Sequence, residues 1–147
     1  MKVLFLCTGN SCRSQMAEGW ARHLKGDAIE AYSAGIDPRR LDPRAVEVMA
    51  EAGVDISAHR AKHVDELMGV EFDYVVTLCG HAREHCPVFP GRAKVVHFGF
   101  DDPPSLAAAA ETPEQAVGAY RRVRDEIRSF VARLPEVLSD PPAPAET

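Results

Sequence analysis

The feature that most constrains this chain is a short loop between an apolar strand and an amphipathic helix near the N-terminus. Residues 2–6 form an apolar run that predicts a buried strand. Residues 14–25 place apolar side chains at helical spacing and predict a helix that ends near Gly26. A strand that turns through a tight loop into a helix is typical of a parallel sheet covered by helices.

Further apolar runs alternate with helical patterns along the rest of the chain. Residues 29–34, 74–78 and 93–98 each predict a strand. The predicted fold class is therefore α/β: a single three-layer domain with a central parallel sheet of about four strands and helices on both faces. The predicted catalytic domain covers residues 1–138, and the proline-rich stretch 139–147 is predicted to be a disordered tail.

Two of the predicted helices carry start signals. Asp42 before Pro43 is typical of a helix N-cap. The side chains of that helix expected to face inward are those of Val46, Met49 and Ala50. Thr112 and Gln115 predict a capping box for the last helix. The apolar stripe of this last helix consists of Ala116, Tyr120, Val123, Ile127, Phe130 and Leu134.

Composition and charge argue against several classes of protein. The chain has 147 residues, which suits one core, and a net charge of -5, so nucleic acid and anionic membranes are not expected partners. No stretch approaches the roughly 20 apolar residues that span a bilayer, and the N-terminal run lacks a signal-peptide cleavage site. We expect a cytoplasmic monomer. Its four cysteines are therefore expected to be catalytic, redox-active or metal-binding rather than structural disulfides.

The segment from Cys7 to Arg13 is predicted to bind an anion because of its context. The spacing alone is not specific, since Cys86 and Arg92 repeat it, but that second segment contains prolines and precedes no helix. In the first segment, main-chain N–H groups can converge on an anion at a helix N-terminus. The predicted oxyanion-binding residues are Thr8, Gly9, Asn10, Ser11, Cys12, Arg13 and Ser14.

Individual residues of this loop have individual expected roles. Gly9 and Asn10 tolerate a positive φ angle, and Arg13 offers a planar fork for two oxygens. The positive field and a hydrogen bond from Ser14 are expected to lower the pKa of Cys7, which makes Cys7 the candidate nucleophile. The alternative is a buried cysteine in an ordinary strand-to-helix turn.

The loop resembles a known active site. Residues 7–14 resemble the active-site loop of low-molecular-weight protein tyrosine phosphatases. Together with residues 32–35, 76–79 and 100–103, the longer run 7–20 is similar to the thioredoxin-coupled arsenate reductases built on that fold. The resemblance implies reduction of arsenate to arsenite, with phosphate and sulfate as substrate analogues. It further implies reduced thioredoxin as partner and electron donor. No tightly bound cofactor and no metal are expected.

The resemblance also implies a general acid, because the oxygen that leaves needs a proton. Asp102, the aspartate directly before Pro103, takes that role by resemblance; a simple loop turn is the alternative, since Asp-Pro pairs are common in turns. Phosphatases of this family have a tyrosine after the Asp-Pro pair. This chain has Pro104 there, which argues against a phosphotyrosine substrate.

The remaining thiols fit the family's redox relay. By resemblance, Cys79 attacks the Cys7 sulfur and forms a transient Cys7–Cys79 disulfide, and Cys86 then forms a Cys79–Cys86 disulfide that thioredoxin reduces. Three alternatives remain open. One is a phosphatase in which Cys79 and Cys86 have no step, and another is a non-catalytic module that binds a metal or metalloid through its thiols. The third is a zinc ion held by Cys79, His81, His85 and Cys86.

Some reductases of this family bind potassium beside the loop. The matching positions here include Asn10, Glu18 and Ser33, but Lys62 stands where those enzymes carry an aspartate. Its ammonium group is expected to take the place of the metal ion and to hold Asn10 or Glu18 directly. No potassium site is therefore expected.

Overall fold

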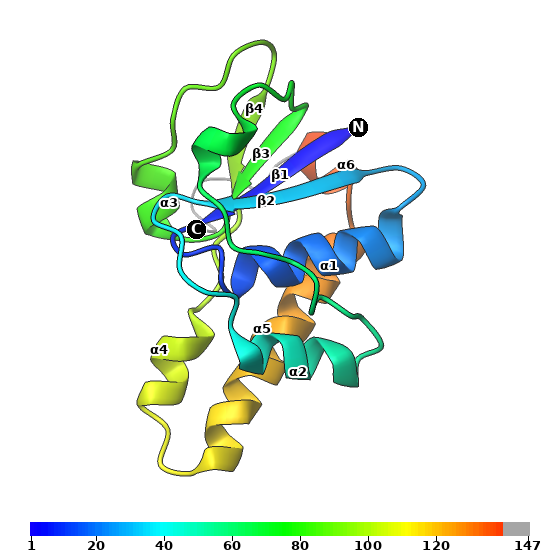
Figure 1. Cartoon of the computed structure of the whole chain (residues 1–147). Coiled ribbons are helices and arrows are strands. Elements are labelled where there is room, and N and C mark those ends of the chain that lie inside the picture. Colours follow the sequence, from blue (N-terminus) through cyan, green and yellow to red (C-terminus); the bar gives the residue numbers. More distant parts are fainter. Residues whose placement is uncertain (140–147) are drawn as a thin grey trace.

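One parallel sheet of four strands, in the order β2-β1-β3-β4, organises the computed structural model (Figure 1). The structure describes residues 1–139, so the predicted tail lies, apart from its first residue, outside the described residues. All the predicted strands are present, within two residues of their expected ends. Their bounds are Lys2–Cys7 for β1, Glu30–Gly35 for β2, Tyr74–Thr77 for β3 and Lys94–His97 for β4.

Helices cover both sides of this sheet, as predicted. Helix α1 packs against β1, β2 and α5, while α3 packs against β1 and β3, and the 3-10 helix η1 packs against β2 (Figure 1). None of the described helices is long and apolar enough to cross a membrane. The helices are α1 (Arg13–Lys25), α2 (Pro43–Glu51), η1 (Val64–Leu67), α3 (Gly80–Glu84), α4 (Pro103–Ala108), α5 (Pro113–Ala132) and α6 (Glu136–Ser139).

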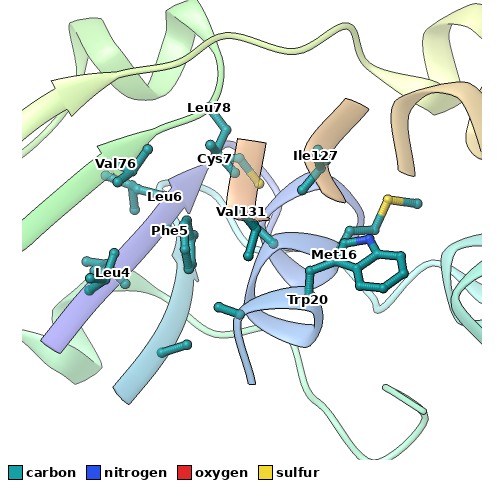
Figure 2. Close-up of a cluster of buried hydrophobic side chains, with 14 of the residues drawn as sticks. Leu4, Phe5, Leu6, Cys7, Met16, Trp20, Val76, Leu78, Ile127 and Val131 are labelled. Atoms are coloured by element: carbon teal, nitrogen blue, oxygen red, sulfur yellow. The ribbon is translucent and has the colours of Figure 1, made fainter. Parts of the chain in front are cut away.

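The buried central strand β1 fixes the position of the loop that follows it. Phe5 points toward the helices α1 and α5, whereas Leu4 and Leu6 point to the opposite side of the sheet (Figure 2). All three side chains are fully buried. Each contributes roughly 1.5–3 kcal/mol by leaving water. Trp20 on α1 also donates a hydrogen bond from Nε1 to the carbonyl of Arg124 on α5, at 3.2 Å. The end of β1 therefore rests on a closely packed core.

The predicted helix starts are correct at their N-caps. The Asp42 side chain accepts a hydrogen bond from the Arg44 amide at 2.9 Å, and the Thr112 hydroxyl accepts one from the Gln115 amide at 3.1 Å. The capping box is only half formed, however. The Gln115 side chain accepts from the amide of Glu111, one residue before the N-cap, rather than from that of Thr112.

The inward face of α2 differs from the prediction by one residue. Ala45, Val48 and Met49 are buried, whereas Val46 is half-buried and Ala50 is exposed. The two sets have the same spacing, so periodicity alone did not choose between them. In the structure α2 packs against α5, and this packing selects the stripe that begins at Ala45.

Candidate active site

The predicted loop connects β1 directly to α1. Cys7 is the last residue of β1, and Cys12 occupies the N-cap of α1 without a side-chain capping bond. The first turn of α1 also has no acidic residue. The N–H groups that begin this helix are therefore available to an anion, as the sequence predicted.

The segment that follows β2 holds the other side of the loop. Loop carbonyls are occupied by its amides, so an anion in the loop does not meet these oxygens as free acceptors. The hydrogen bonds, 2.8–3.1 Å long, run from Ile36 to Cys7, from Asp37 to Thr8, from Arg39 to Gly9 and from Asp42 to Ser11. Gly35 permits this approach, since a Cβ there would lie 2.6 Å from the Thr8 carbonyl oxygen.

The backbone of the loop corrects one prediction and agrees with another. Asn10 has a φ of 50°, so the expected left-handed conformation occurs there. Gly9 is not among the positive-φ residues, so the prediction for Gly9 is wrong. Space at position 9 is tight instead, because a Cβ would lie 3.0 Å from Cγ of Arg39, and that side chain would have to shift to admit it.

A chain of hydrogen bonds leads to the Cys7 sulfur. Asn10 Nδ2 donates to Ser14 Oγ at 2.7 Å, and Ser14 Oγ lies 2.9 Å from Cys7 Sγ. When Cys7 is a thiolate its sulfur can only accept, so Ser14 Oγ is then the donor of this bond. The loop thus presents a donor to Cys7, which favours the thiolate over the thiol.

Burial nevertheless has a larger effect on the pKa of Cys7 than the hydrogen bonds and charge of the loop have. Cys7 is 2% exposed, and burial raises its pKa above the ordinary value. The hydrogen bond from Ser14, the charge of Arg13 and the main-chain N–H groups of Ser14 and Asn10 all lower the pKa, but only in part. The predicted downward shift is therefore wrong. Cys12, also buried, has a pKa raised well above its usual value by burial and by the charge of Asp42, so it stays a neutral thiol.

This balance makes the pH dependence of Cys7 alkylation a direct test of Ser14. In Ser14→Ala the burial is kept and a hydrogen bond to the thiolate is lost, so the pKa of Cys7 rises further. The rate of Cys7 carboxymethylation at pH 7.5, followed by peptide mass spectrometry, is expected to fall about tenfold. Ser57→Ala, an exposed serine bonded to Asp55, is the control. An unchanged profile in Ser14→Ala would contradict the role of Ser14.

Cys7, Arg13 and Asp102 meet at one cavity of about 270 Å³. Arg13 donates to the Phe100 carbonyl at 3.0 Å, and its guanidinium lies 3.4 Å from an Asp102 carboxylate oxygen. The guanidinium is thus fixed at the cavity between two acceptors. The cavity is lined by Cys7, Thr8, Gly9, Ser11, Cys12, Arg13, Arg39, Asp102 and Pro104.

The structure separates the two neighbouring aspartates that precede Pro103. Asp102 lines the cavity and accepts a hydrogen bond from Ser105 at 2.7 Å. Asp101 pairs instead with Arg122 of α5, at 2.9 Å. The sequence analysis did not predict α4, whose first residue is Pro103; packing of α4 on α5 carries Asp102 to the cavity.

A second thiol touches the loop. Cys79 Sγ lies 3.3 Å from Thr8 Oγ1, the hydroxyl next in sequence to Cys7. The parallel pairing of β1 with β3, in register from Val3–Tyr74 to Leu6–Thr77, brings these residues together at the same edge of the sheet. Cys79 is 8% exposed, caps α3 and accepts from the Ala82 amide at 3.4 Å.

Cys86 follows α3 and is half-buried. Burial raises the pKa of its thiol. All four cysteines are free. Within residues 1–139 there is no group of three or more His, Cys, Asp or Glu side chains that could hold a metal ion, so the four side chains of the zinc alternative are not brought together.

Sequence reasoning named Asn10, Glu18 and Ser33 beside the loop but missed Gln15 and His59, which belong to the same polar layer. Gln15 Nε2 donates to Asn10 Oδ1 at 3.0 Å, and Gln15 Oε1 lies 3.0 Å from Nδ1 of His59. His59 Nε2 is 3.9 Å from a carboxylate oxygen of the buried Glu18, which also accepts from Ser33. His59 is remote in sequence and carries no local pattern, so nothing in the sequence links it to the loop.

Lys62 reaches this layer differently from the prediction. Its main-chain N–H, rather than its ammonium group, donates to Asn10 Oδ1 at 3.0 Å. The ammonium group donates to the Arg60 carbonyl at 3.3 Å. Burial lowers the pKa of Lys62, and the charge of Glu18 opposes this effect. The direct bond from the ammonium group to Asn10 or Glu18 that was expected is therefore not formed.

Arg39 is the one cavity residue with a charged side chain that the sequence analysis missed. It follows β2, the neighbour of β1 in a parallel sheet. The carboxyl ends of parallel strands share one edge of a sheet, so the residues after β2 lie beside Cys7. A predicted strand order, which the sequence analysis did not give, would have placed Arg39 at the cavity.

Comparisons with known proteins agree with this site. An arsenate reductase of Halalkalibacterium halodurans is 50% identical over 134 residues, which cover 91% of this chain and 94% of the relative. Among solved structures, an arsenate reductase in a phosphate-binding state matches with a TM-score of 0.73 and 31% identity, covering 90% of this chain and 95% of the other. The thioredoxin-dependent arsenate reductase of Corynebacterium glutamicum matches with a TM-score of 0.68 and 26% identity, covering 94% and 60%.

The family comparison covers nearly the whole chain. Residues 2–140 match the family described as low molecular weight phosphotyrosine protein phosphatase. That match includes the Cys7 loop, Asp102 and both further cysteines. This chain belongs to the low molecular weight phosphotyrosine protein phosphatase family.

Proposed function

We propose that this protein is an arsenate reductase that attacks arsenate with Cys7 and passes the resulting oxidation through Cys79 to Cys86. The observation that carries the proposal is the contact between Cys79 Sγ and Thr8 Oγ1 at the anion loop. Reduction of arsenate to arsenite needs two electrons, and a second thiol beside the nucleophile can supply them as a disulfide forms. Hydrolysis of a phosphate ester has no use for that thiol.

The first step joins Cys7 to arsenic. Arsenate binds to the loop N–H groups and to Arg13, as an oxyanion does at a helix N-terminus. The Cys7 thiolate forms a sulfur–arsenic bond while an arsenic–oxygen bond breaks. Asp102, which lines the same cavity, accepts the proton that Cys7 loses and gives it to the oxygen that leaves as water. Arsenic is still arsenic(V) at this point, because the exchange of oxygen for sulfur does not reduce it.

The second step performs the reduction. The Cys79 thiolate attacks the Cys7 sulfur, so a Cys7–Cys79 disulfide forms and the sulfur–arsenic bond breaks. The electron pair of the broken bond stays on arsenic, which leaves as arsenite. The two thiolates have been oxidised to one disulfide and arsenic(V) has been reduced to arsenic(III), so the electrons balance.

The third step returns Cys7 to its thiolate. Cys86 attacks Cys79, and the disulfide moves to Cys79–Cys86. The exposure of the thiols favours this direction, since Cys7 is 2% exposed, Cys79 is 8% exposed and Cys86 is half-buried. Thiol exchange requires access to a sulfur. Reduced thioredoxin is the proposed partner that reopens the outer disulfide, and a reducing cytoplasm is the proposed compartment.

The cavity favours a free oxyanion over an aromatic phosphate ester. Pro104 lines it, at the position where the resemblance places a tyrosine in phosphatases of this family. A proline ring lacks the flat aromatic face that packs against a phosphotyrosine. Hydrolysis of aryl phosphates remains the competing activity, because it uses the same nucleophile, arginine and acid.

A coupled assay tests the proposal. The reduced protein is mixed with arsenate, thioredoxin, thioredoxin reductase and NADPH, and the absorbance of NADPH is followed. We expect NADPH oxidation that depends on arsenate, on thioredoxin and on the protein. In parallel, hydrolysis of an aryl phosphate is expected to be slow or absent. Rapid aryl phosphate hydrolysis without any arsenate-dependent NADPH oxidation would overturn the proposal in favour of a phosphatase.

A further inference from the structure

We propose that Arg39 is a second arginine that binds the oxyanion in the cavity that it lines together with Arg13. This inference deepens the proposed function and rests on it for the identity of the substrate. It concerns a residue outside the loop from Cys7 to Ser14, on the segment that follows β2. Its role is to bind the substrate, and it takes no part in the chemical steps.

The position of Arg39 is fixed by the loop itself. Its main-chain N–H donates to the Gly9 carbonyl at 2.8 Å, and its Cγ occupies the space that a Cβ at Gly9 would need, 3.0 Å away. The aliphatic part of the side chain therefore lies on the loop. From there the side chain lines the same cavity as Cys7 and Arg13.

The charges around the cavity indicate that Arg39 contributes to anion binding. The ionisable side chains of this lining, apart from the cysteines, are Arg13, Arg39 and Asp102. Asp102 lies 3.4 Å from Arg13 and offsets its positive charge. Without Arg39, the charges of Arg13 and Asp102 would cancel and leave the lining with no net positive charge. The proposed ligand, however, is a dianion. In a protein of net charge -5, Arg39 supplies the local positive charge that attracts it.

Asp37, the ion-pair partner of Arg39, does not compete strongly with an oxyanion for the guanidinium group. Its guanidinium lies 3.3 Å from a carboxylate oxygen of Asp37, and the two side chains are 70% and 65% exposed. A pair this exposed contributes little to stability because water screens it. Arg39 can therefore exchange the Asp37 carboxylate for oxyanion oxygens, whose geometry fits the planar guanidinium.

Arg39→Gln, compared with Arg40→Gln, tests the proposal. Glutamine keeps the methylene groups that cover Gly9 but removes the charge. Arg40 is the exposed neighbour, does not line the cavity, and loses the same charge from nearly the same place. The probe is inorganic sulfate or phosphate, with its affinity measured as saturable protection of Cys7 from carboxymethylation. The steady-state kinetics with arsenate are measured beside it.

We expect Arg39→Gln to weaken sulfate and phosphate binding about five- to thirtyfold and to raise KM for arsenate by a similar factor, with kcat within about twofold. Arg40→Gln is expected to change either value less than about twofold. Arg39→Lys is expected to lie between wild type and Arg39→Gln, since it keeps the charge without the planar fork.

The outcomes separate this proposal from the proposed function. Equal weakening in Arg39→Gln and Arg40→Gln, or a fall in kcat without a change in KM, would overturn the role of Arg39. Unchanged sulfate binding in Arg39→Gln beside normal arsenate reduction would also overturn it and leave the function standing. If the wild type reduces no arsenate but Arg39→Gln still weakens sulfate binding, Arg39 is an anion-binding residue and the arsenate assignment fails.

Discussion

Cys86→Ser is expected to produce one arsenite per protein molecule and then to stop. The first two steps of the proposed mechanism need only Cys7, Asp102 and Cys79, so arsenic is expected to be reduced once. The expected product is a Cys7–Cys79 disulfide between residues that are 2% and 8% exposed in the reduced protein. Thioredoxin cannot approach sulfurs so deeply buried, and thiol exchange needs that approach. Sustained turnover is expected to fall by at least about a thousandfold, since the recycling step is removed entirely.

Cys79→Ser is the matched variant, because it removes the preceding thiol. Its Cys7 can still attack arsenate, but no thiol is left beside Cys7 to break the sulfur–arsenic bond, so less than one arsenite is expected. Single-turnover arsenite is measured by rapid quench, and the disulfides are mapped by mass spectrometry. A Cys7–Cys79 bond should accumulate in Cys86→Ser alone. Sustained thioredoxin-dependent turnover of Cys86→Ser would remove Cys86 from the relay, and normal arsenite release by Cys79→Ser would remove Cys79.

The fold was accessible from sequence because its signals are local. The strands are short runs with several apolar residues, and β1 shows this most clearly, with Val3 to Cys7 all buried. The edge strand β4 was found from the same signal although none of its residues is buried. Asp42 and Thr112 mark helix starts through bonds to amides two and three residues away. The one-residue error on α2 has the opposite origin. The buried stripe from Ala45 to Met49 is chosen by contact with α5, which the sequence of α2 does not contain.

The candidate site also has one part that depends on local sequence and another that depends on contacts between distant segments. Cys7 and Arg13 belong to one contiguous motif between two predicted elements, so their joint position was predictable. Arg39 and His59 reach the site from segments distant in sequence: Arg39 bonds and packs against Gly9, and His59 bonds Gln15, the residue directly after the loop. Only a predicted strand order would have placed Arg39 there, and no sequence feature would have placed His59.

The pKa of Cys7 shows a different limit. The sequence indicates the donors that lower it, Ser14 and Arg13, and both lie where the loop predicts them. The sequence does not indicate that Cys7 is 2% exposed, and burial acts on the pKa in the opposite direction with the larger effect. The sign of a pKa shift depends on the competition between burial and local donors. A motif specifies only the donors.

Asp102→Asn is expected to lower the rate of the first chemical step by about a hundred- to ten-thousandfold, the usual contribution of a general acid. Asparagine has the same shape and cannot donate the proton. Its side-chain oxygen can still accept the hydrogen bond from Ser105, so α4 is expected to keep its place. Removing a negative charge 3.4 Å from Arg13 makes the cavity more positive. Sulfate binding is therefore expected to be unchanged or tighter while the rate collapses.

Asp101→Asn is the matched control, one residue away and with the same change in charge. Asp101 pairs with Arg122 on the surface and does not line the cavity, so its loss is expected to change the rate less than about twofold. Single-turnover arsenite formation is measured for both variants, since steady-state turnover also depends on thioredoxin. Equal losses in the two variants would indicate a general charge effect. A full rate in Asp102→Asn with the loss in Asp101→Asn would transfer the acid to Asp101, whereas a loss in Asp102→Asn alone, with sulfate binding retained, identifies the proton donor.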